Sequence, residues 1–164
     1  MIRNATLNDT SAICDIYNHY IKNTIITFEE EPLTNEAMQG RIEEVTATLP
    51  WLVFENENNI VGFAYASRWN GRCAYRYAVE STIYLAPNAT GRGIGKQLYR
   101  ELIDILKQQS MHSIIGGVTL PNPASVALHK KLGFKKVAHF EQVGWKFNQW
   151  IDVAYWELIL GKSI

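Results

Sequence analysis

Glu80 is the side chain whose surroundings in the sequence most favour proton transfer. It interrupts residues 75–85, a stretch rich in aromatic and β-branched side chains, where an unpaired carboxylate would be costly to bury. A carboxylate in such a place can act as a general base, which takes a proton from a reacting group. The pattern equally allows a structural role, on a solvated face or in an ion pair with Arg72 or Arg76.

Glycines and cations gather in residues 87–96, between a strand end and a helix start. Glycines let the backbone approach a ligand closely, and the free N–H groups of the following helix point outward at the positive end of its dipole. Arg92 and Lys96 add positive charge. The segment therefore predicts a seat for a pyrophosphate group. The alternative is a glycine-rich turn with a structural role only.

Two familiar phosphate-binding motifs do not fit this segment. The Walker A motif needs GxxxxGK followed by Ser or Thr, and Gln97 follows Lys96 here. The dinucleotide fingerprint GxGxxG needs a third glycine where Lys96 stands. Nucleotide hydrolysis and dinucleotide binding of these two types are thus excluded.

Cations lie beside aromatic side chains in residues 68–76. An arginine can hold the carboxylate of an amino acid through two parallel hydrogen bonds. Arg72 and Arg76, with Tyr75, are therefore candidates for binding an acceptor molecule, and Phe28 could form an apolar wall. The alternative is a set of ordinary surface arginines.

The elements that position these residues follow from hydrophobic periodicity and turn signals. Helices are predicted after Asn8 or Asp9, after Thr34, from residues 91–96 onward, and over residues 123–132, where Gly133 ends the last one. Strands are predicted at residues 2–4, 51–55, 60–67, 75–85, 113–118, 135–143 and 151–160. This order predicts an α/β fold with a central mixed, mostly antiparallel, twisted sheet and helices on both faces. Its βαβ unit should cross over right-handed.

Composition fits a single domain that spans residues 1–164. Sixteen basic and sixteen acidic residues cancel, so the positive field typical of a nucleic-acid-binding protein is missing. Cys14 and Cys73 are too few for a disulfide framework and wrongly spaced for zinc, and no metal site is expected. No run of apolar residues is close to the length of about 20 residues that is needed to span a bilayer. We expect a cytoplasmic protein without nucleic-acid or membrane partners.

The glycine segment resembles the pyrophosphate loop of the GCN5-related N-acetyltransferase superfamily. That loop has Gln or Arg, two residues, Gly, one residue, and then Gly or Ala; the glycines match Gly93 and Gly95, while Thr90 takes the first position. A second resemblance is an Asn before a short helix that ends near Gly-Phe, here Asn122 and residues 133–134. Five further segments resemble the phosphinothricin N-acetyltransferase branch: residues 18–21, 50–53, 79–84, 120–126 and 148–153. The similarity covers about residues 2–160.

The resemblance implies acetyl-CoA as cosubstrate, with no metal. In the superfamily the strand before the loop bulges and splays from its neighbour, and its exposed groups pair with the cofactor. Asn122 and Ser125 match positions that meet the pantetheine or phosphate end. The residues implied in cofactor binding are Ile83, Tyr84, Leu85, Gly91, Arg92, Gly93, Ile94, Gly95, Lys96, Asn122 and Ser125.

The resemblance also implies roles in catalysis and acceptor binding. Glu80 matches the general base of the branch, acting directly or through water. His129 stands where most of the superfamily has a Tyr that protonates the leaving thiolate; an imidazole there can do the same or assist the base, or lie on the helix surface. Arg72 and Tyr75 match positions near the acceptor. A homodimer is implied, in which Lys146 or Asn148 reaches the partner's pocket.

The function predicted from these residues is acetyl transfer from acetyl-CoA to the α-amino group of a small, amino-acid-like acceptor. The branch resemblance implies phosphinothricin or methionine sulfoximine as acceptor, and hence herbicide resistance. Ordinary L-amino acids or another small amine are alternative acceptors. A sensor that binds acyl-CoA without catalysis is a further alternative, which Glu80 and His129 argue against because a sensor needs neither group.

Overall fold

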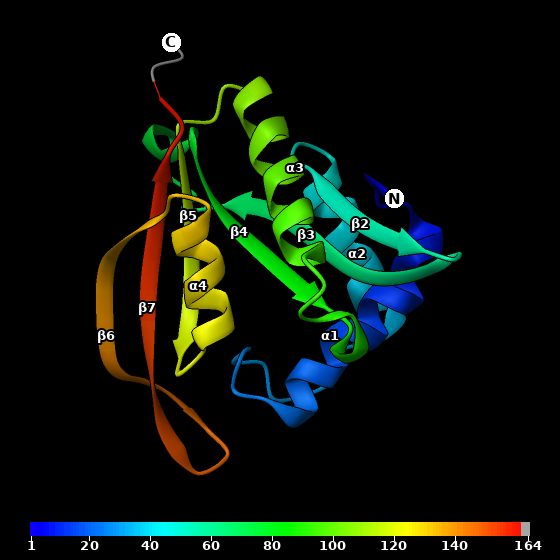
Figure 1. The fold of residues 1–164 in the computed structure, drawn as a ribbon, viewed down its shortest axis with the longest axis horizontal. Helices are drawn as coiled ribbons and strands as arrows, with labels where there is room; N and C mark the ends of the chain where they lie inside the picture. Colours follow the sequence, from blue (N-terminus) through cyan, green and yellow to red (C-terminus); the bar gives the residue numbers. More distant parts are fainter. Residues whose placement is uncertain (162–164) are drawn as a thin grey trace.

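The computed structural model describes residues 1–161, so the last three residues of the predicted domain lie outside the described part. Seven strands form one sheet in the order β1-β2-β3-β4-β5-β7-β6 (Figure 1), and only the β4–β5 pair is parallel. The strands are β1 (Ile2–Asn4), β2 (Trp51–Asn56), β3 (Asn59–Arg68), β4 (Ala78–Leu85), β5 (Ser113–Leu120), β6 (Lys135–Lys146) and β7 (Gln149–Ile159). The predicted mixed, mostly antiparallel sheet is confirmed.

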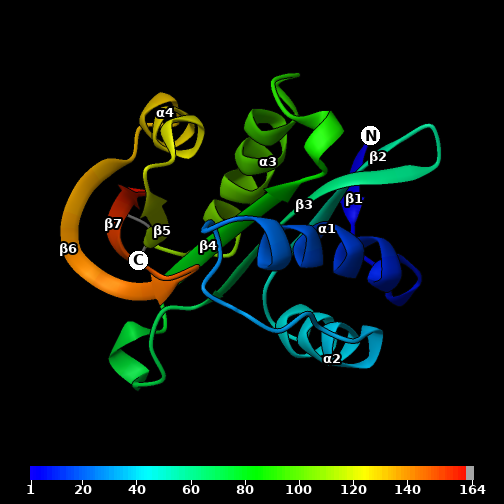
Figure 2. The ribbon, with the colours of Figure 1, turned by 90° about the horizontal axis from the view of Figure 1, so that it is seen from below.

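Helices cover both faces of the sheet, as predicted. They are α1 (Thr10–Asn23), α2 (Asn35–Thr46), α3 (Ile94–Gln108) and α4 (Pro123–Lys131). Figure 2 shows α1 and α2 on one side and α3 and α4 on the other. Two separate apolar clusters result, because α1 and α2 bury Ile13 and Ile42 against one face, whereas α3 buries Leu98 and Leu102 against the other.

Most helix ends lie where the capping residues in the sequence predict them. The Oγ1 atom of Thr34 accepts a hydrogen bond from the N–H of Ala37 at 3.1 Å and caps α2. Gly133, with φ of +90°, follows α4 in the left-handed conformation that glycine adopts at little cost. The predicted inward face of α3 is buried except at Ile105, which is half-buried.

Most strand boundaries lie within two residues of the prediction, and the boundaries of β4 and β6 differ by three. The strand expected from residue 75 begins at Ala78, because residues 73–75 form the short 3-10 turn η2 (Cys73–Tyr75). In that turn the N–H of Tyr75 donates to the carbonyl of Arg72, and Arg76 Nη1 donates to the carbonyl of Cys73 at 3.1 Å. Local turn bonds thus overrule the strand propensity of the aromatic residues there. Strand β6 extends to Lys146 and contains irregular pairing at Phe140–Gly144.

Strands β4 and β5 pair over only three residues. Ala78, Val79 and Glu80 of β4 pair with residues 113–115 of β5, whereas the outer edges stay paired to Leu85 in β4 and to Leu120 in β5. The two strands therefore diverge beyond Glu80, as the family resemblance implied. The bulge implied in the same strand is absent, since β4 pairs with β3 in unbroken register.

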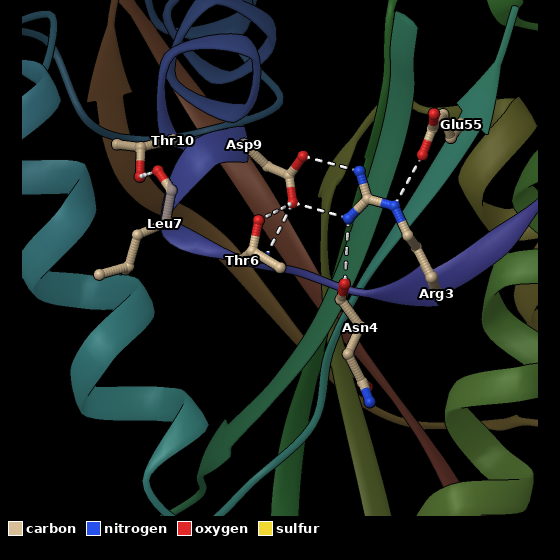
Figure 3. A network of polar contacts seen from close by, with 7 residues as sticks. All are labelled: Arg3, Asn4, Thr6, Leu7, Asp9, Thr10 and Glu55. Atoms are coloured by element: carbon tan, nitrogen blue, oxygen red, sulfur yellow. Dashed lines mark hydrogen bonds and ion pairs between the residues drawn. The ribbon is translucent and has the colours of Figure 1, made fainter. Parts of the chain in front are cut away.

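An ion-pair network fixes the N-terminal strand beside the first helix (Figure 3). Arg3 Nη1 and Nη2 each lie 2.8 Å from an oxygen of Asp9, and Arg3 Nε lies 2.7 Å from Glu55 Oε2. Asp9 also accepts from the backbone N–H of Thr6 at 2.8 Å. The prediction that Asp9 or Asn8 caps α1 is therefore wrong for the side chain, because the carboxylate is turned toward Arg3 and Thr6. These bonds lower the pKa of Asp9 to about 2, mainly through Arg3.

We expect Asp9→Asn to lower the free energy of unfolding by about 2 kcal/mol at pH 7, since it removes the charged partner of Arg3. The folded-state pKa of Asp9 is depressed, so its contribution is complete above about pH 4 and is lost as the pH falls through about 2. Urea unfolding at several pH values should show the wild type and the variant converging toward pH 2. Asp15→Asn, on the exposed side of α1, is the control and should change little. A constant difference at all pH values would contradict the assignment.

Candidate active site

A cavity of about 500 Å³ opens where β4 and β5 part. Its walls come from β4, β5, α3, α4, the loop after α1 and the β6–β7 hairpin. Of the residues implied in cofactor binding, Ile83, Tyr84, Asn122 and Ser125 line it. Both predicted catalytic side chains also line it. The structure thus brings the two titratable groups together in one cavity.

Glu80 and His129 approach this cavity from opposite faces of the sheet. A Cβ added to Gly116 would lie 2.5 Å from His129 Nε2, whereas one added to Gly117 would lie 3.6 Å from Glu80 Oε1. Consecutive residues of a strand point to opposite faces of the sheet. His129, next to Gly116, and Glu80, next to Gly117, therefore lie on opposite sides of β5. His129 belongs to the side of α3 and α4, and Glu80 to the side of α1 and α2. Only the divergence of β4 and β5 connects them.

Glu80 is half-buried, and burial raises the pKa of its carboxyl group. It forms no ion pair within residues 1–161, so the alternative of a pair with Arg72 or Arg76 is not observed. A carboxylate that is poorly solvated and lacks a charged partner binds a proton more tightly than one in water. That property suits a general base for an amine.

His129 is buried, so the alternative of a helix-surface histidine is wrong. Its Nδ1 lies 2.8 Å from the backbone carbonyl of Ser125, and its Nε2 lies 3.1 Å from the hydroxyl of Tyr99. Burial lowers the pKa of the imidazole. The neutral ring is therefore favoured at neutral pH.

The glycine segment has the geometry expected of an anion seat. Gly91 and Gly93 take positive φ values of 76° and 77°, and α3 begins directly after them. The first N–H to bond within the helix is that of Gln97, which donates to the carbonyl of Gly93. The earlier N–H groups have no intrahelical acceptor. Lys96 adds a charge, and its pKa is lowered by its cationic neighbours Arg100 and Lys131.

The glycine segment adjoins the cavity although it does not line it. A Cβ on Gly95 would meet side chains of Leu85, Ile83 and Leu128 at 3.5–3.7 Å. The start of α3 therefore packs between the end of β4 and α4. Arg92 faces a small hollow beside the β2–β3 turn instead. An elongated ligand could reach from the anion seat to the cavity along β4.

The start of α4 contributes a second group of polar atoms. Asn122 Oδ1 accepts from the N–H of Ser125 at 3.1 Å and caps the helix. Ser125 Oγ lies 3.4 Å from His129 Nδ1. This cap lies near the unpaired inner edge of β4 and the anion seat at α3. Together these groups fit a ligand that carries both peptide-like amides and phosphates, and acetyl-CoA is such a ligand.

The candidate acceptor residues are divided between two hollows. Phe28 lines the main cavity, whereas Arg72, Tyr75 and Arg76 line a separate hollow of about 280 Å³ beside η2. η2 lies on the same side of the sheet as α1 and α2 in Figure 2. Trp69 of the same loop packs edge-on against Tyr155, which lines the main cavity, at 5.7 Å between ring centroids.

The two residues expected to act across a dimer differ in placement. Lys146 is buried in its own chain, and its Nζ donates to the carbonyl of Thr27 at 2.8 Å. Burial lowers the pKa of this amine. Asn148 lies at the exposed tip of the β6–β7 hairpin with φ of +57°. Lys146 thus supports the cavity wall at Thr27 of its own chain.

Sequence reasoning missed Tyr99, Ser81 and Tyr155, which line the cavity. Tyr99 follows Leu98 on the buried face of α3 and therefore reads as an ordinary core aromatic. Ser81 is the only one with a local signal, since a hydroxyl next to Glu80 in an apolar strand needs a partner when buried. Nothing in the sequence pairs it with Tyr99.

The split sheet, the glycine turn at α3 and two titratable groups on opposite faces define an acyltransferase. The chain belongs to the acetyltransferase (GNAT) domain family, whose model matches residues 2–155. It is 38% identical over 156 residues to phosphinothricin N-acetyltransferase of Streptomyces viridochromogenes, covering 95% of this chain and 85% of the relative. It is 32% identical over 162 residues to L-methionine sulfoximine/L-methionine sulfone acetyltransferase of Salmonella typhimurium, covering 98% and 95%.

A solved structure has nearly the same fold. It is a phosphinothricin acetyltransferase of Sinorhizobium meliloti in complex with AcCoA, with a TM-score of 0.96 and 35% identity over 98% of this chain and 88% of that chain. The predicted family and its acetyl-CoA cosubstrate are confirmed, and the chain is an N-acetyltransferase that acts on an amine. Within residues 1–161, no helix is long and apolar enough to cross a membrane. That part of the chain also contains no cluster of three metal-ligating side chains.

The ring of Phe28 occupies the space above Gly144, where an added Cβ would collide with it. We expect Gly144→Ala to displace Phe28 and to raise the KM for the amine about three- to tenfold, because overpacking forces a shift of the wall. The KM for acetyl-CoA should stay within twofold. Gly40→Ala, where an added Cβ meets nothing within 4 Å, is the control. Steady-state kinetics with both substrates measures the effect, and an unchanged KM for the amine would remove Phe28 from the acceptor site.

Proposed function

We propose that this enzyme acetylates the α-amino group of a small amino-acid-like acceptor of the phosphinothricin or methionine sulfoximine type. The observation that carries this proposal is the position of Glu80, a half-buried carboxylate that has no ionic partner among residues 1–161 and lies in a cavity of about 500 Å³. Such a volume suits a small molecule. The names of the relatives supply the acceptor type, since one acts on phosphinothricin and another on methionine sulfoximine.

Glu80 is the proposed general base. Amines are largely protonated at neutral pH, and the ammonium form has no lone pair with which to attack. Glu80 takes this proton, directly or through water, and the neutral amine then forms the new C–N bond. Acetyl-CoA supplies the acetyl group as a thioester, whose C–S bond breaks so that the sulfur leaves as thiolate. The nitrogen loses its second proton as the amide forms, and the thiolate takes up a proton in its place. Because the pKa of Glu80 is raised, proton transfer from the ammonium is less unfavourable than to an ordinary carboxylate.

The anion seat and the diverging strands are proposed to hold acetyl-CoA. Gly91, Gly93 and the start of α3 bind the pyrophosphate, with Arg92 and Lys96 as nearby cations. Because backbone groups alternate along an antiparallel strand, those of Ile83 and Leu85 face the opening left by β5 and are proposed to pair with the amide-bearing arm, whereas Tyr84 lines the cavity. A backbone N–H at this edge polarises the thioester carbonyl. Asn122 and Ser125 lie at the other wall.

The acceptor carboxylate is proposed to bind Arg72, with Tyr75 and Arg76 beside it. Neither arginine forms an ion pair within residues 1–161, so their charges are available to a ligand. Their loop lies on the Glu80 side of the sheet and touches the cavity wall through Trp69. Phe28 provides the apolar wall.

We also propose that the enzyme is a cytoplasmic homodimer that confers herbicide resistance where phosphinothricin is the acceptor. Cys14 and Cys73 are both free thiols, which suits a reducing compartment. The β6–β7 hairpin exposes Val143, Trp145 and Trp150, an apolar surface that a second copy would bury. Asn148 at its tip is the residue proposed to reach the partner's pocket.

Ordinary L-amino acids or another small amine remain the alternative acceptors, and a panel of amines assayed by thiol release distinguishes them. Activity with amino-acid analogues and none with amines that lack a carboxylate would support the clamp assigned to Arg72. Inactivity with every α-amino acid would reject it. Binding of acetyl-CoA without any turnover would favour the non-catalytic sensor.

We expect Glu80→Gln to lower kcat by roughly 10²–10⁴, because the amide cannot accept the proton. In the wild type, kcat/KM should fall as the pH drops through the raised pKa of Glu80, since the protonated acid is no longer a base. The variant should lose this acid limb. Acetyl-CoA affinity, measured by calorimetry, should be nearly unchanged. Glu44→Gln, exposed on α2, is the control. Full activity of Glu80→Gln would assign Glu80 to structure.

A further inference from the structure

Three side chains from three elements form a hydrogen-bonded chain at one wall of the cavity. Ser81 of β4 bonds to the hydroxyl of Tyr99 in α3, and that hydroxyl bonds to Nε2 of His129 in α4 at 3.1 Å. All three side chains are buried and line the cavity. The chain joins the point where β4 leaves β5 to the helix that carries the histidine.

The partners of His129 determine where its proton sits. The carbonyl of Ser125 can only accept a hydrogen bond, so Nδ1, at 2.8 Å, must carry a proton. In the neutral ring Nε2 then has a lone pair, and the hydroxyl of Tyr99 donates to it. Ser81 in turn donates to the oxygen of Tyr99, which is nearer than its other acceptor, the carbonyl of Ile115 at 3.4 Å. Every polar atom of the chain is thereby satisfied with a neutral imidazole.

The surroundings of the ring contain few other groups that could set its protonation. From α3 it faces Tyr99, whose pKa is raised mainly by burial and which stays a neutral donor at neutral pH. β5 contributes Gly116, and β7 contributes the uncharged ring of Trp156, which Lys130 approaches at 5.7 Å. From β4, Glu80 lies across the strand on the opposite face.

We propose that Tyr99 is a positioning residue of the reaction, which acts through His129. Its hydroxyl, held by Ser81, fixes the imidazole as the neutral tautomer protonated at Nδ1 and keeps the ring in one orientation. Gly116 makes the arrangement possible, since a side chain there would collide with Nε2. The proposal rests on the proposed function and on the part in proton transfer that the family resemblance implies for His129.

The tautomer of His129 decides whether its Nε2 accepts or donates a proton. A ring that is neutral at rest and has its lone pair at Nε2 can accept a proton there but cannot donate one. Donation from Nε2 requires prior protonation and a reversed hydrogen bond with Tyr99. Tyr99 therefore selects the proton-accepting state of the histidine, a role that packing alone would not give it.

Tyr99→Phe tests the proposal, because it removes the hydroxyl and keeps the ring that packs edge-on against His129 and Phe134. The neutral ring loses a donor, so the pKa of His129 should rise, by roughly 0.5–1 pH unit. Titration of the histidine resonances by nuclear magnetic resonance measures this shift in the free enzyme, with His129→Gln for assignment. We expect kcat to fall about tenfold to a hundredfold while the KM for acetyl-CoA stays within twofold.

Ser81→Ala provides a second variant that leaves the Tyr99 ring untouched. It should raise the pKa of His129 in the same direction by a smaller amount. Ser113→Ala, which removes a buried hydroxyl bonded to Glu157 at the other end of β5, is the matched control and should leave the His129 titration unchanged. Thermal unfolding checks that each variant is folded at the assay temperature.

An unchanged pKa and tautomer of His129 in both variants would overturn the proposal, even if kcat falls, because Tyr99 would then act by another route. A raised pKa with unaltered kcat would also overturn it, since the histidine state would not matter to the reaction. The titration needs no turnover. Inactivity of the wild type on every amine would therefore reject the proposed function separately.

Discussion

The early separation of β4 from β5 is the constraint on which the site depends. Two parallel strands that stopped pairing inside a buried sheet would leave N–H and C=O groups without partners, at a cost for each group comparable to a lost hydrogen bond. Here the strands part after Glu80 and Ile115, while their outer edges stay fully paired. The unpaired inner edges therefore face a cavity instead of a neighbour. A ligand with alternating donors and acceptors would restore the missing bonds, which is the physical reason for proposing that an amide-bearing thioester binds here.

The same separation allows chemistry from two sides of one sheet. Alternation along a strand sends Glu80 and Ser81 to opposite faces, and Gly116 and Gly117 leave room for what meets them. Elsewhere in the sheet, groups on opposite faces are isolated by the backbone between them. At the split they border one cavity. The proposed cofactor seat belongs to the α3 side and the proposed general base to the α1 side, so donor and acceptor can enter from different directions.

How much the sequence predicts depends on whether a feature is local. The glycine turn, the cap at Thr34 and the α3 stripe are set by neighbours in the chain, and the structure has them where the sequence places them. The interior strand start at Ala78 was missed, because turn bonds near Cys73 compete with strand propensity. Tyr99 was missed for another reason: its hydroxyl bonds to residues 18 positions before it and 30 positions after it. No spacing in the sequence reveals such a contact.

Burial shifts the pKa values of Glu80 and His129 in opposite directions, so that the proton affinities of the two groups become more alike. Loss of water disfavours a carboxylate and an imidazolium alike, so the pKa of Glu80 rises while that of His129 falls. In water the two groups differ by about two pKa units, with the imidazole as the stronger base. In the cavity that difference shrinks, and the free energy of placing a proton on either group becomes more nearly equal. Glu80 can therefore take up the proton of an amine on its own face of the sheet. Glu80 and His129 do not first form a strongly favoured carboxylate–imidazolium pair. The neutral histidine and the partnerless carboxylate are thus two results of one cause, the water-poor space between diverging strands.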